Sequence, residues 1–187
     1  MQRLPPHLAL PVALAMFTGL RQGDVLSLTK AAIKNGSIWR KTGKTGQKVF
    51  LPIHPDLAEV LASAPTHDAI TIAANVHGKP WTPDGFRASF GSAMVKLRES
   101  GDVEPGLTFH GLRHTVGTLL REETDDLDLI RRWLGQKTLA MAIHYSDTAD
   151  TSKQMLDVVE RLDPLGSKPG TKVSNTPKKV SNKKPPM

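Results

Sequence analysis

Apolar residues near the start of the chain follow a helical pattern. The segment 7–18 is apolar on nearly every side, which predicts a buried helix with Pro11 in its first turn or at a kink. This helix is expected to end at Gly19, and a second short helix follows with three apolar residues facing inward: Val25, Leu26 and Leu28. The apolar run is too short to span a bilayer and only Arg3 is basic before it, so it is interpreted as a core helix and not as a targeting signal.

Residues 31–53 change to short runs of β-branched and aromatic residues on either side of the turn KTGKTGQ. Gly43 and Gly46 suit a turn, so this stretch predicts a β-hairpin or a small antiparallel sheet. A helix is expected at 55–64, and the run AITIAA at 69–74 is compatible with a short strand.

The second half of the chain is helical in pattern. Pro83-Asp84 opens a helix of about 84–99 with one apolar face, formed by Phe86, Phe90, Met94 and Leu97. The next helix should start at about His110 or Gly111. Two more are expected over LDLIRRWLG, with Gly135 at its C-terminal end, and over LAMAIHYS, capped by Thr138.

A final amphipathic helix is expected at 151–162, where Thr151 and Gln154 have the spacing of a capping box. Its apolar face could pack on its own domain or on another protein chain. Together these elements predict a mainly α fold with a small antiparallel β-sheet, an α+β domain over residues 1–163. Residues 164–187 contain mostly Lys, Pro, Ser, Gly and Asn, which predicts a disordered basic tail.

Composition narrows the possible functions. The chain has 25 basic and 18 acidic residues, a net charge of +7. Six lysines and no acids lie after Gly166, so the rest of the chain has 19 basic and 18 acidic residues and is almost neutral. Any argument for nucleic-acid binding must therefore rest on where the charges lie. The absence of cysteine excludes disulfides and thiolate chemistry, and it is compatible with a reducing cytoplasm.

Several charged residues are candidates for phosphate binding, and each has an ordinary alternative. Arg21 and Asp24 have the spacing of a simple surface ion pair. Four basic residues surround the hairpin turn, where they could contact phosphates or only solvent: Arg40, Lys41, Lys44 and Lys48. His110 and Arg113 share a helix start, whose free N–H groups can bind an anion, although a buried histidine and an exposed paired arginine would look the same.

Four motifs occur in a fixed order: TGLRQGD, KTGQKVFLP, TFHGLRHT, and a tyrosine ten residues after an LG pair. In this order and spacing they resemble the catalytic domain of the tyrosine recombinases, the phage integrase family, over about residues 7–150. The resemblance implies the DNA breaking-rejoining fold of that family. Members normally carry an N-terminal domain that clamps the DNA. Only about six residues precede the first helix here, so that domain is expected to be absent and the catalytic domain to be clipped at its start.

The resemblance also implies roles for individual residues. Arg21 and Arg113 match the two catalytic arginines, and Asp24 matches the acid that follows the first. Lys44 matches the hairpin lysine, with Lys41 as the alternative. His110 matches the histidine of the HxxR box, and Tyr145, the only tyrosine, matches the nucleophile. Lys41 and Lys48 are candidates for DNA contacts.

Gln136 departs from the family pattern, which usually has histidine there and sometimes tryptophan. A glutamine side chain can donate a hydrogen bond to a phosphate oxygen, but it cannot carry a proton between groups. The position is therefore included among the candidate catalytic residues, with reduced turnover as the expected consequence.

The implied chemistry matches these residue types. Two arginines bind phosphate oxygens bidentately and stay charged, and they would stabilise the transition state. Tyrosine has a pKa of about 10 in water, so it needs a base or positive surroundings, and His110 would accept or orient its proton. Lys44 is the candidate general acid for the leaving 5′ oxygen. The resemblance implies a 3′-phosphotyrosyl intermediate, which requires no metal or other cofactor.

The sequence therefore predicts a site-specific recombinase or integrase that acts on double-stranded DNA, assembles as a tetramer, and contacts no membrane. It is expected in the cytoplasm of a bacterial or phage-derived system, near the nucleoid. Two alternatives stay open. One is a catalytically weak or inactive DNA-binding remnant, and the other is a type IB topoisomerase.

Overall fold

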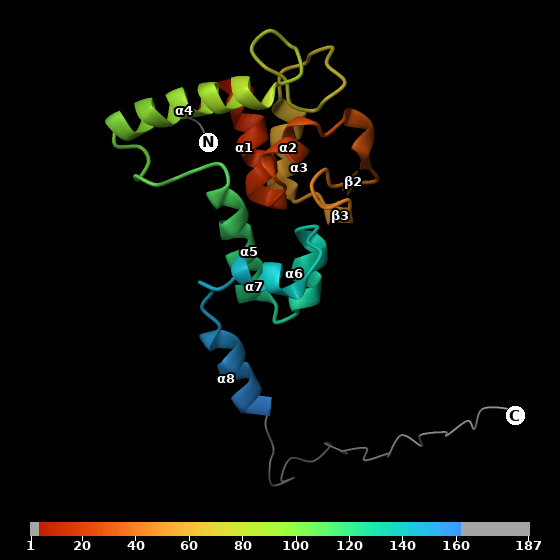
Figure 1. Cartoon of the computed structure of the whole chain (residues 1–187), viewed down its shortest axis with the longest axis vertical. Helices are drawn as coiled ribbons and strands as arrows, with labels where there is room; N and C mark the ends of the chain where they lie inside the picture. The colour runs from red at the N-terminus through yellow and green to blue at the C-terminus, as the bar shows by residue number, and fades with distance from the viewer. Residues whose placement is uncertain (1–3, 162–187) are drawn as a thin grey trace, which may run out of the picture.

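The computed structural model describes residues 4–161, which form a helical body with a small sheet packed on one side of it (Figure 1). The first helix, α1 (Pro6–Thr18), lies at the centre of the body, and its apolar residues are buried on several sides. Pro11 lies inside the helix. The short α2 (Gln22–Leu26) follows at once and buries Val25 and Leu26. These two elements agree with the expected pattern.

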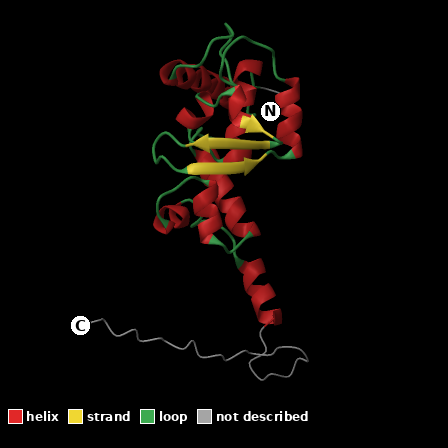
Figure 2. Ribbon diagram, turned by 90° about the vertical axis from the view of Figure 1, so that its right-hand side faces the viewer, coloured by secondary structure: helices red, strands yellow, loops and turns green. Residues whose placement is uncertain are grey.

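The sheet has three antiparallel strands in the order β1-β2-β3, visible face-on in Figure 2. A short 3-10 turn, η1 (Lys30–Ala32), leads into β1 (Ile33–Lys34), β2 (Ser37–Lys41) and β3 (Lys48–Pro52). Ile38 pairs with Leu51, and both side chains face the core. On the opposite face Trp39 and Phe50 pair and are about half exposed, with ring centroids 4.6 Å apart. The predicted hairpin is therefore confirmed.

The helices α3 (Pro55–Ser63) and α4 (Pro83–Glu99) begin near the predicted positions, and Thr82 caps α4 by accepting a hydrogen bond from the Gly85 N–H. The strand considered at 69–74 does not form. Thr71 makes one bridging pair with Thr29, and Ala74 makes one with Pro80. Each is a single isolated pair, so this segment is a loop that connects α3 to α4.

The chain then forms α5 (Gly111–Glu123), α6 (Leu127–Trp133) and α7 (Leu139–His144). These helices enclose a small apolar cluster of their own, separate from the larger core around α1. Its buried members are Val116, Ile130, Leu134, Ala142 and Tyr145. Thr138 precedes α7, but its side chain makes no capping hydrogen bond, so that part of the prediction was wrong.

The two clusters are joined by polar contacts at the end of α1. The indole N–H of Trp133 donates to the Thr18 carbonyl at 3.1 Å. The buried guanidinium of Arg113 donates to the Gly19 carbonyl at 2.6 Å and to the Leu134 carbonyl at 2.7 Å. These hydrogen bonds thus cross the seam between the two clusters, where the Trp133 side chain packs against both.

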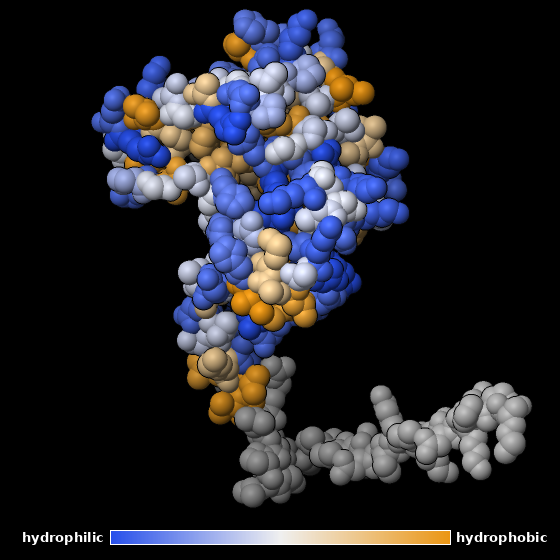
Figure 3. Space-filling view, viewed as in Figure 1, coloured by the Kyte–Doolittle hydropathy of each residue, from blue (hydrophilic) through white to orange (hydrophobic). Residues whose placement is uncertain are grey.

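The last described helix, α8 (Ser152–Arg161), projects from the body (Figure 1). The capping box was wrong, because the Gln154 side chain instead donates to the carbonyls of Arg121 and Glu122 at the end of α5. The apolar face does not pack on its own domain: four of its side chains are 45–66% exposed, namely Met155, Leu156, Val158 and Val159. Figure 3 shows the apolar surface gathered there. The predicted tail, 164–187, lies outside the described residues.

Within residues 4–161, none of the helices combines the length and apolar character needed to cross a bilayer.

Candidate active site

Tyr145 follows directly after α7, and its side chain is largely buried in the small cluster, with 6% of its surface exposed. The hydroxyl lies 3.3 Å from Nε2 of His110, which accepts its hydrogen when that nitrogen is unprotonated. The Arg113 guanidinium carbon is 4.8 Å from the centre of the tyrosine ring. The His114 ring centroid is 4.4 Å from that of Tyr145. The only tyrosine is thus held between a candidate base and a cation.

Gly117 lets the tyrosine backbone lie directly against α5. A Cβ at this position would overlap the carbonyl oxygen of Tyr145 and would lie 3.0 Å from its carbonyl carbon. Any side chain at Gly117 must therefore displace the tyrosine. The residue is four positions after Arg113, on the same face of the helix.

Arg113 is 2% exposed and belongs to both the site and the framework. Its two terminal nitrogens bind backbone carbonyls across the seam, while its Nε has no partner. Burial lowers the pKa of Arg113 to about 10, with the nearby cation of Arg21 as the next cause, while Tyr145 and Asp24 oppose the shift. At neutral pH the guanidinium is still charged, and it is positioned before any substrate arrives.

Arg21 lies near both Arg113 and His110, and its positive charge lowers the pKa of each. It does not form the simple pair with Asp24 that its spacing allowed. Its Nη1 is buried and has no hydrogen-bond partner. Buried donors are normally paired, so unpaired donors on two neighbouring arginines indicate a place for an anion.

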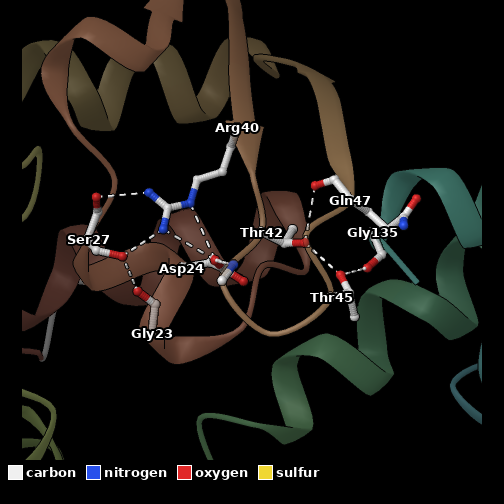
Figure 4. A network of polar contacts seen from close by, with 9 residues as sticks. Gly23, Asp24, Ser27, Arg40, Thr42, Thr45, Gln47 and Gly135 are labelled. Atoms are coloured by element: carbon white, nitrogen blue, oxygen red, sulfur yellow. Dashed lines mark hydrogen bonds and ion pairs between the residues drawn. The ribbon is translucent and has the colours of Figure 1, made fainter. Parts of the chain in front are cut away.

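Asp24 instead anchors the hairpin, as Figure 4 shows. Its carboxylate is buried and pairs with Arg40 of β2, with 3.3 Å between Oδ1 and Nη2. The same oxygen accepts the Gly43 backbone N–H at 2.7 Å. Arg40 is held further by the Ser27 hydroxyl at 2.7 Å and the Ser27 carbonyl at 2.9 Å. The acid after the first arginine therefore sets the position of the loop that carries Lys44.

Lys44 is exposed at the tip of this loop, and its ammonium is one of the cations that lower the pKa of His110. The loop is also attached to the segment before Tyr145. The Thr45 hydroxyl donates to the Gly135 carbonyl at 2.7 Å, and the Thr42 hydroxyl lies 2.6 Å from that of Thr45. Gly135 has a φ of +58°, and a Cβ there would lie 2.8 Å from side-chain atoms of both Thr42 and Val49.

His110 is the N-cap residue of α5. Its pKa is lowered from 6.5, first by partial burial among its neighbours and then by four cationic or ionisable side chains: His114, Arg113, Arg21 and Lys44. Part of the ring surface is nevertheless open to solvent. The imidazole is therefore neutral at pH 7 and can accept a proton.

Gln136 is fully buried, and neither its amide nitrogen nor its amide oxygen has a hydrogen-bond partner. Only its backbone is held, by hydrogen bonds to the backbone and guanidinium of Arg131. Lys41 and Lys48 are exposed and face one another across the ends of β2 and β3. The structure thus brings together five of the predicted site residues: Arg21, Lys44, His110, Arg113 and Tyr145. The side chains of Gln136, Lys41 and Lys48 make no polar contact with that group.

Several contributing residues were not singled out from the sequence: Ser27, Thr42, Thr45, Gly117 and His144. Arg40 was considered as a phosphate contact, and in the structure it pairs with Asp24 instead. The His144 ring contacts both His114 and Tyr145, with centroids 5.4 Å apart in each case. Gly117 could have been found from its spacing to Arg113 on one helix. The hairpin contacts could not, since they join residues up to ninety positions apart. No three or more His, Asp or Glu side chains of residues 4–161 are grouped to hold a metal ion.

The pH dependence of strand cleavage should follow His110. Because its pKa is lowered, the neutral form that accepts the tyrosine proton persists below pH 6.5, and the rate should fall only at still lower pH. His110→Gln should remove this acid limb and slow cleavage by roughly 10²–10⁴-fold. Single-turnover cleavage rates from pH 5 to 8 measure this. His144→Gln is the matched control and should keep the limb, and a limb centred above pH 6.5 would contradict the assignment.

Residues 2–152 match the model of the phage integrase family. The integrase of Escherichia phage HK022 is 31% identical over 153 residues, covering 78% of this chain and 42% of that protein. Tyrosine recombinase XerC of Rickettsia canadensis is 27% identical over 138 residues, covering 71% of this chain and 44% of that protein.

Among solved structures, a lambda integrase tetramer bound to a Holliday junction superposes with a TM-score of 0.62 and 27% identity, over 79% of this chain and 43% of that chain. The match thus covers less than half the length of each of these three proteins.

Proposed function

Since the chain belongs to the phage integrase family, we propose that it breaks and rejoins double-stranded DNA through a 3′-phosphotyrosyl intermediate on Tyr145. The observation that carries this proposal is the contact between the Tyr145 hydroxyl and His110 Nε2, at 3.3 Å, beside two arginines with unpaired buried donors. The relatives are named integrases and recombinases, and one is solved on a Holliday junction. The catalytic unit is proposed to be residues 1–163.

In the forward step, the Tyr145 oxygen attacks the scissile phosphorus and its proton passes to Nε2 of His110. The bond between phosphorus and the 5′ oxygen breaks, and Lys44 supplies the proton that this oxygen takes up. The phosphodiester becomes a phosphotyrosyl diester, so its bond energy is kept and no external energy source enters. Attack by the 5′ hydroxyl of a second strand reverses these steps and joins the strands.

The two arginines are proposed to hold the non-bridging oxygens. Arg21 Nη1 and Arg113 Nε are buried without partners, and a phosphate would satisfy both. Loss of one such donor in a preorganised site costs about 2.7–4 kcal/mol of transition-state stabilisation. The unpaired amide of Gln136 is proposed as a third donor to the phosphate, reached when DNA enters the site.

A nicked suicide duplex with a randomised core tests the proposal. Cleavage releases a short strand, so the covalent adduct accumulates and can be separated by denaturing electrophoresis. Mass spectrometry should then show a 3′-linked nucleotide on the peptide containing Tyr145, and sequencing of the attached DNA identifies the preferred core. If no adduct forms, or if the DNA is linked through its 5′ end, the proposal fails.

The same assay separates the alternatives. A weakly active remnant would give little adduct, and Gln136→His would increase it by restoring a proton carrier beside the phosphate. Relaxation of supercoiled DNA with no preferred core would favour a type IB topoisomerase instead.

Lys41 and Lys48 are proposed to contact the DNA backbone beside the cleaved phosphate, because both are exposed at the end of the hairpin next to Lys44. Replacing either with alanine should weaken binding to all sequences equally and reduce the slope of log affinity against log salt by about one. Salt titrations by fluorescence anisotropy measure this. Lys79→Ala, in the connection before α4, is the control, and a selective loss at one sequence would argue for base recognition.

Self-association on DNA is proposed to use α8, whose apolar face is not covered by its own domain. Leu156→Asp with Val159→Asp should leave the monomer folded and prevent higher assemblies on DNA, because burying a carboxylate in an apolar contact is costly. Analytical ultracentrifugation of the DNA complex measures this, with Lys153→Asp at the polar edge of the helix as control. Assemblies of unchanged size would exclude α8.

The relatives come from a phage and a bacterium, so activity is expected in bacterial cytoplasm.

A further inference from the structure

The loop that carries Lys44, residues 42–47, is attached on both sides of the lysine. Before it, the Gly43 N–H donates to the buried Asp24 carboxylate at 2.7 Å. After it, the Thr45 hydroxyl donates to the Gly135 carbonyl at 2.7 Å. Thr45 is thus the residue that joins the lysine loop to the segment leading to Tyr145 (Figure 4).

Each threonine hydroxyl has a single proton to donate, and this determines which of Thr42 and Thr45 is the donor in the contact between them. A hydroxyl has one hydrogen, and that of Thr45 goes to Gly135, so in the 2.6 Å contact with Thr42 the donor is Thr42. The Thr42 hydroxyl also lies 3.1 Å from the Gln47 carbonyl, and the Thr42 N–H donates to that carbonyl at 2.9 Å. The loop is therefore closed internally by Thr42 and held externally by Thr45.

The receiving surface is shaped for this contact. Gly135 adopts a left-handed φ of +58° and has no side chain. Thr42 and Val49 pack so close to it that a Cβ on Gly135 would lie only 2.8 Å from each of their side chains. Its carbonyl points to Thr45, while the carbonyl of the preceding Leu134 accepts Arg113. Two successive carbonyls at the end of α6 thus hold the catalytic arginine and the lysine loop.

We propose that Thr45 is a positioning residue, which docks the loop on Gly135 so that the Lys44 ammonium reaches the leaving 5′ oxygen. The inference rests on the proposed strand cleavage. Lys44 is exposed, and without the Thr45 hydrogen bond its loop keeps the polar attachment to Asp24 and only a packing contact with Gly135, through Thr42. The docking also links proton donation to the segment that carries the nucleophile, so the two are in place together.

The expected result is a defect confined to the leaving-group step. Thr45→Val keeps the shape and removes the hydroxyl, and it should slow cleavage of ordinary DNA roughly 10- to 100-fold, below the 10²–10⁴-fold effect of losing a general acid outright. DNA with sulfur in place of the bridging 5′ oxygen releases a thiolate, a far weaker base than an alkoxide, which leaves without a proton donor. On that substrate Thr45→Val and Lys44→Ala should both approach the wild-type rate.

Matched variants separate docking from a general loss of structure. Thr45→Ser retains the hydroxyl and should cleave both substrates near the wild-type rate, and Thr66→Val changes an exposed threonine far from the loop and should have no effect. A Thr45→Val protein that cleaves ordinary DNA normally, or that is equally slow on both substrates, would overturn the proposal.

A second measurement does not depend on activity. Backbone hydrogen exchange over residues 42–47 should speed up in Thr45→Val and not in Thr45→Ser, because the loop loses an attachment. Unchanged exchange would reject the docking even if the protein cleaves DNA. If wild-type protein forms no adduct while the exchange result holds, the proposed function fails and the docking role stands.

Discussion

Replacing Tyr145 with phenylalanine should abolish the covalent adduct completely while leaving the fold and the DNA affinity intact. The hydroxyl is the proposed attacking group, and no other tyrosine exists in the chain. The ring, by contrast, is what packs in the small cluster beside Arg113 and His114, and phenylalanine keeps it. The lost contacts are the 3.3 Å hydrogen bond to a partly open histidine and the polar interaction with Arg113, so stability should fall by about 0.5–1.5 kcal/mol for each.

Three measurements on the same preparation test this expectation: adduct formation on the suicide duplex, thermal unfolding, and binding to the uncut duplex. Tyr145→Ala is the contrasting variant. It removes the buried ring as well as the hydroxyl, and large-to-small changes of this kind cost roughly 3–5 kcal/mol, so it should lose both adduct and stability. An adduct that persists in Tyr145→Phe would show that another residue is the nucleophile.

The family and the fold class could be predicted because their signals are local. The helix of 7–18, the hairpin around Gly43 and Gly46, and the helix starting at Gly111 each arise from periodicity or turn residues within a short stretch, and the structure has all three. The strand considered at 69–74 does not form, because a β-branched composition makes a strand only where a neighbouring strand can pair with it.

The site was predicted as a set of residue types but not as an arrangement. The spacing of Arg21 and Asp24 suggested an ion pair between them, whereas Asp24 binds Arg40 sixteen positions later and leaves Arg21 unpaired. Thr45 and Gly135 meet across ninety positions, a contact that depends on how α6 packs against the sheet. Such contacts are set by tertiary packing, which periodicity cannot report.

Replacing Arg113 or Arg21 with alanine should have the same effect on cleavage and different effects on folding. Both variants should lose adduct formation by about 10²–10³-fold or more, because each removes donors proposed to stabilise the same transition state. Their effects on folding should differ. Arg113→Ala deprives two buried carbonyls of their donors, those of Gly19 and Leu134, and opens the seam between the two clusters. Unsatisfied buried groups cost about 1–3 kcal/mol each, so the melting temperature should drop sharply.

Arg21→Ala should leave the melting temperature unchanged or slightly higher. Its Nη1 makes no hydrogen bond, and its charge repels that of Arg113, whose pKa it lowers. Arg113→Lys gives the third comparison, since it keeps a charge but cannot reach two carbonyls in a planar fork. Calorimetry and single-turnover cleavage on all three variants decide the matter. A drop in melting temperature for Arg21→Ala as large as that for Arg113→Ala would mean that Arg21 is bonded within the protein and is not free to bind a phosphate.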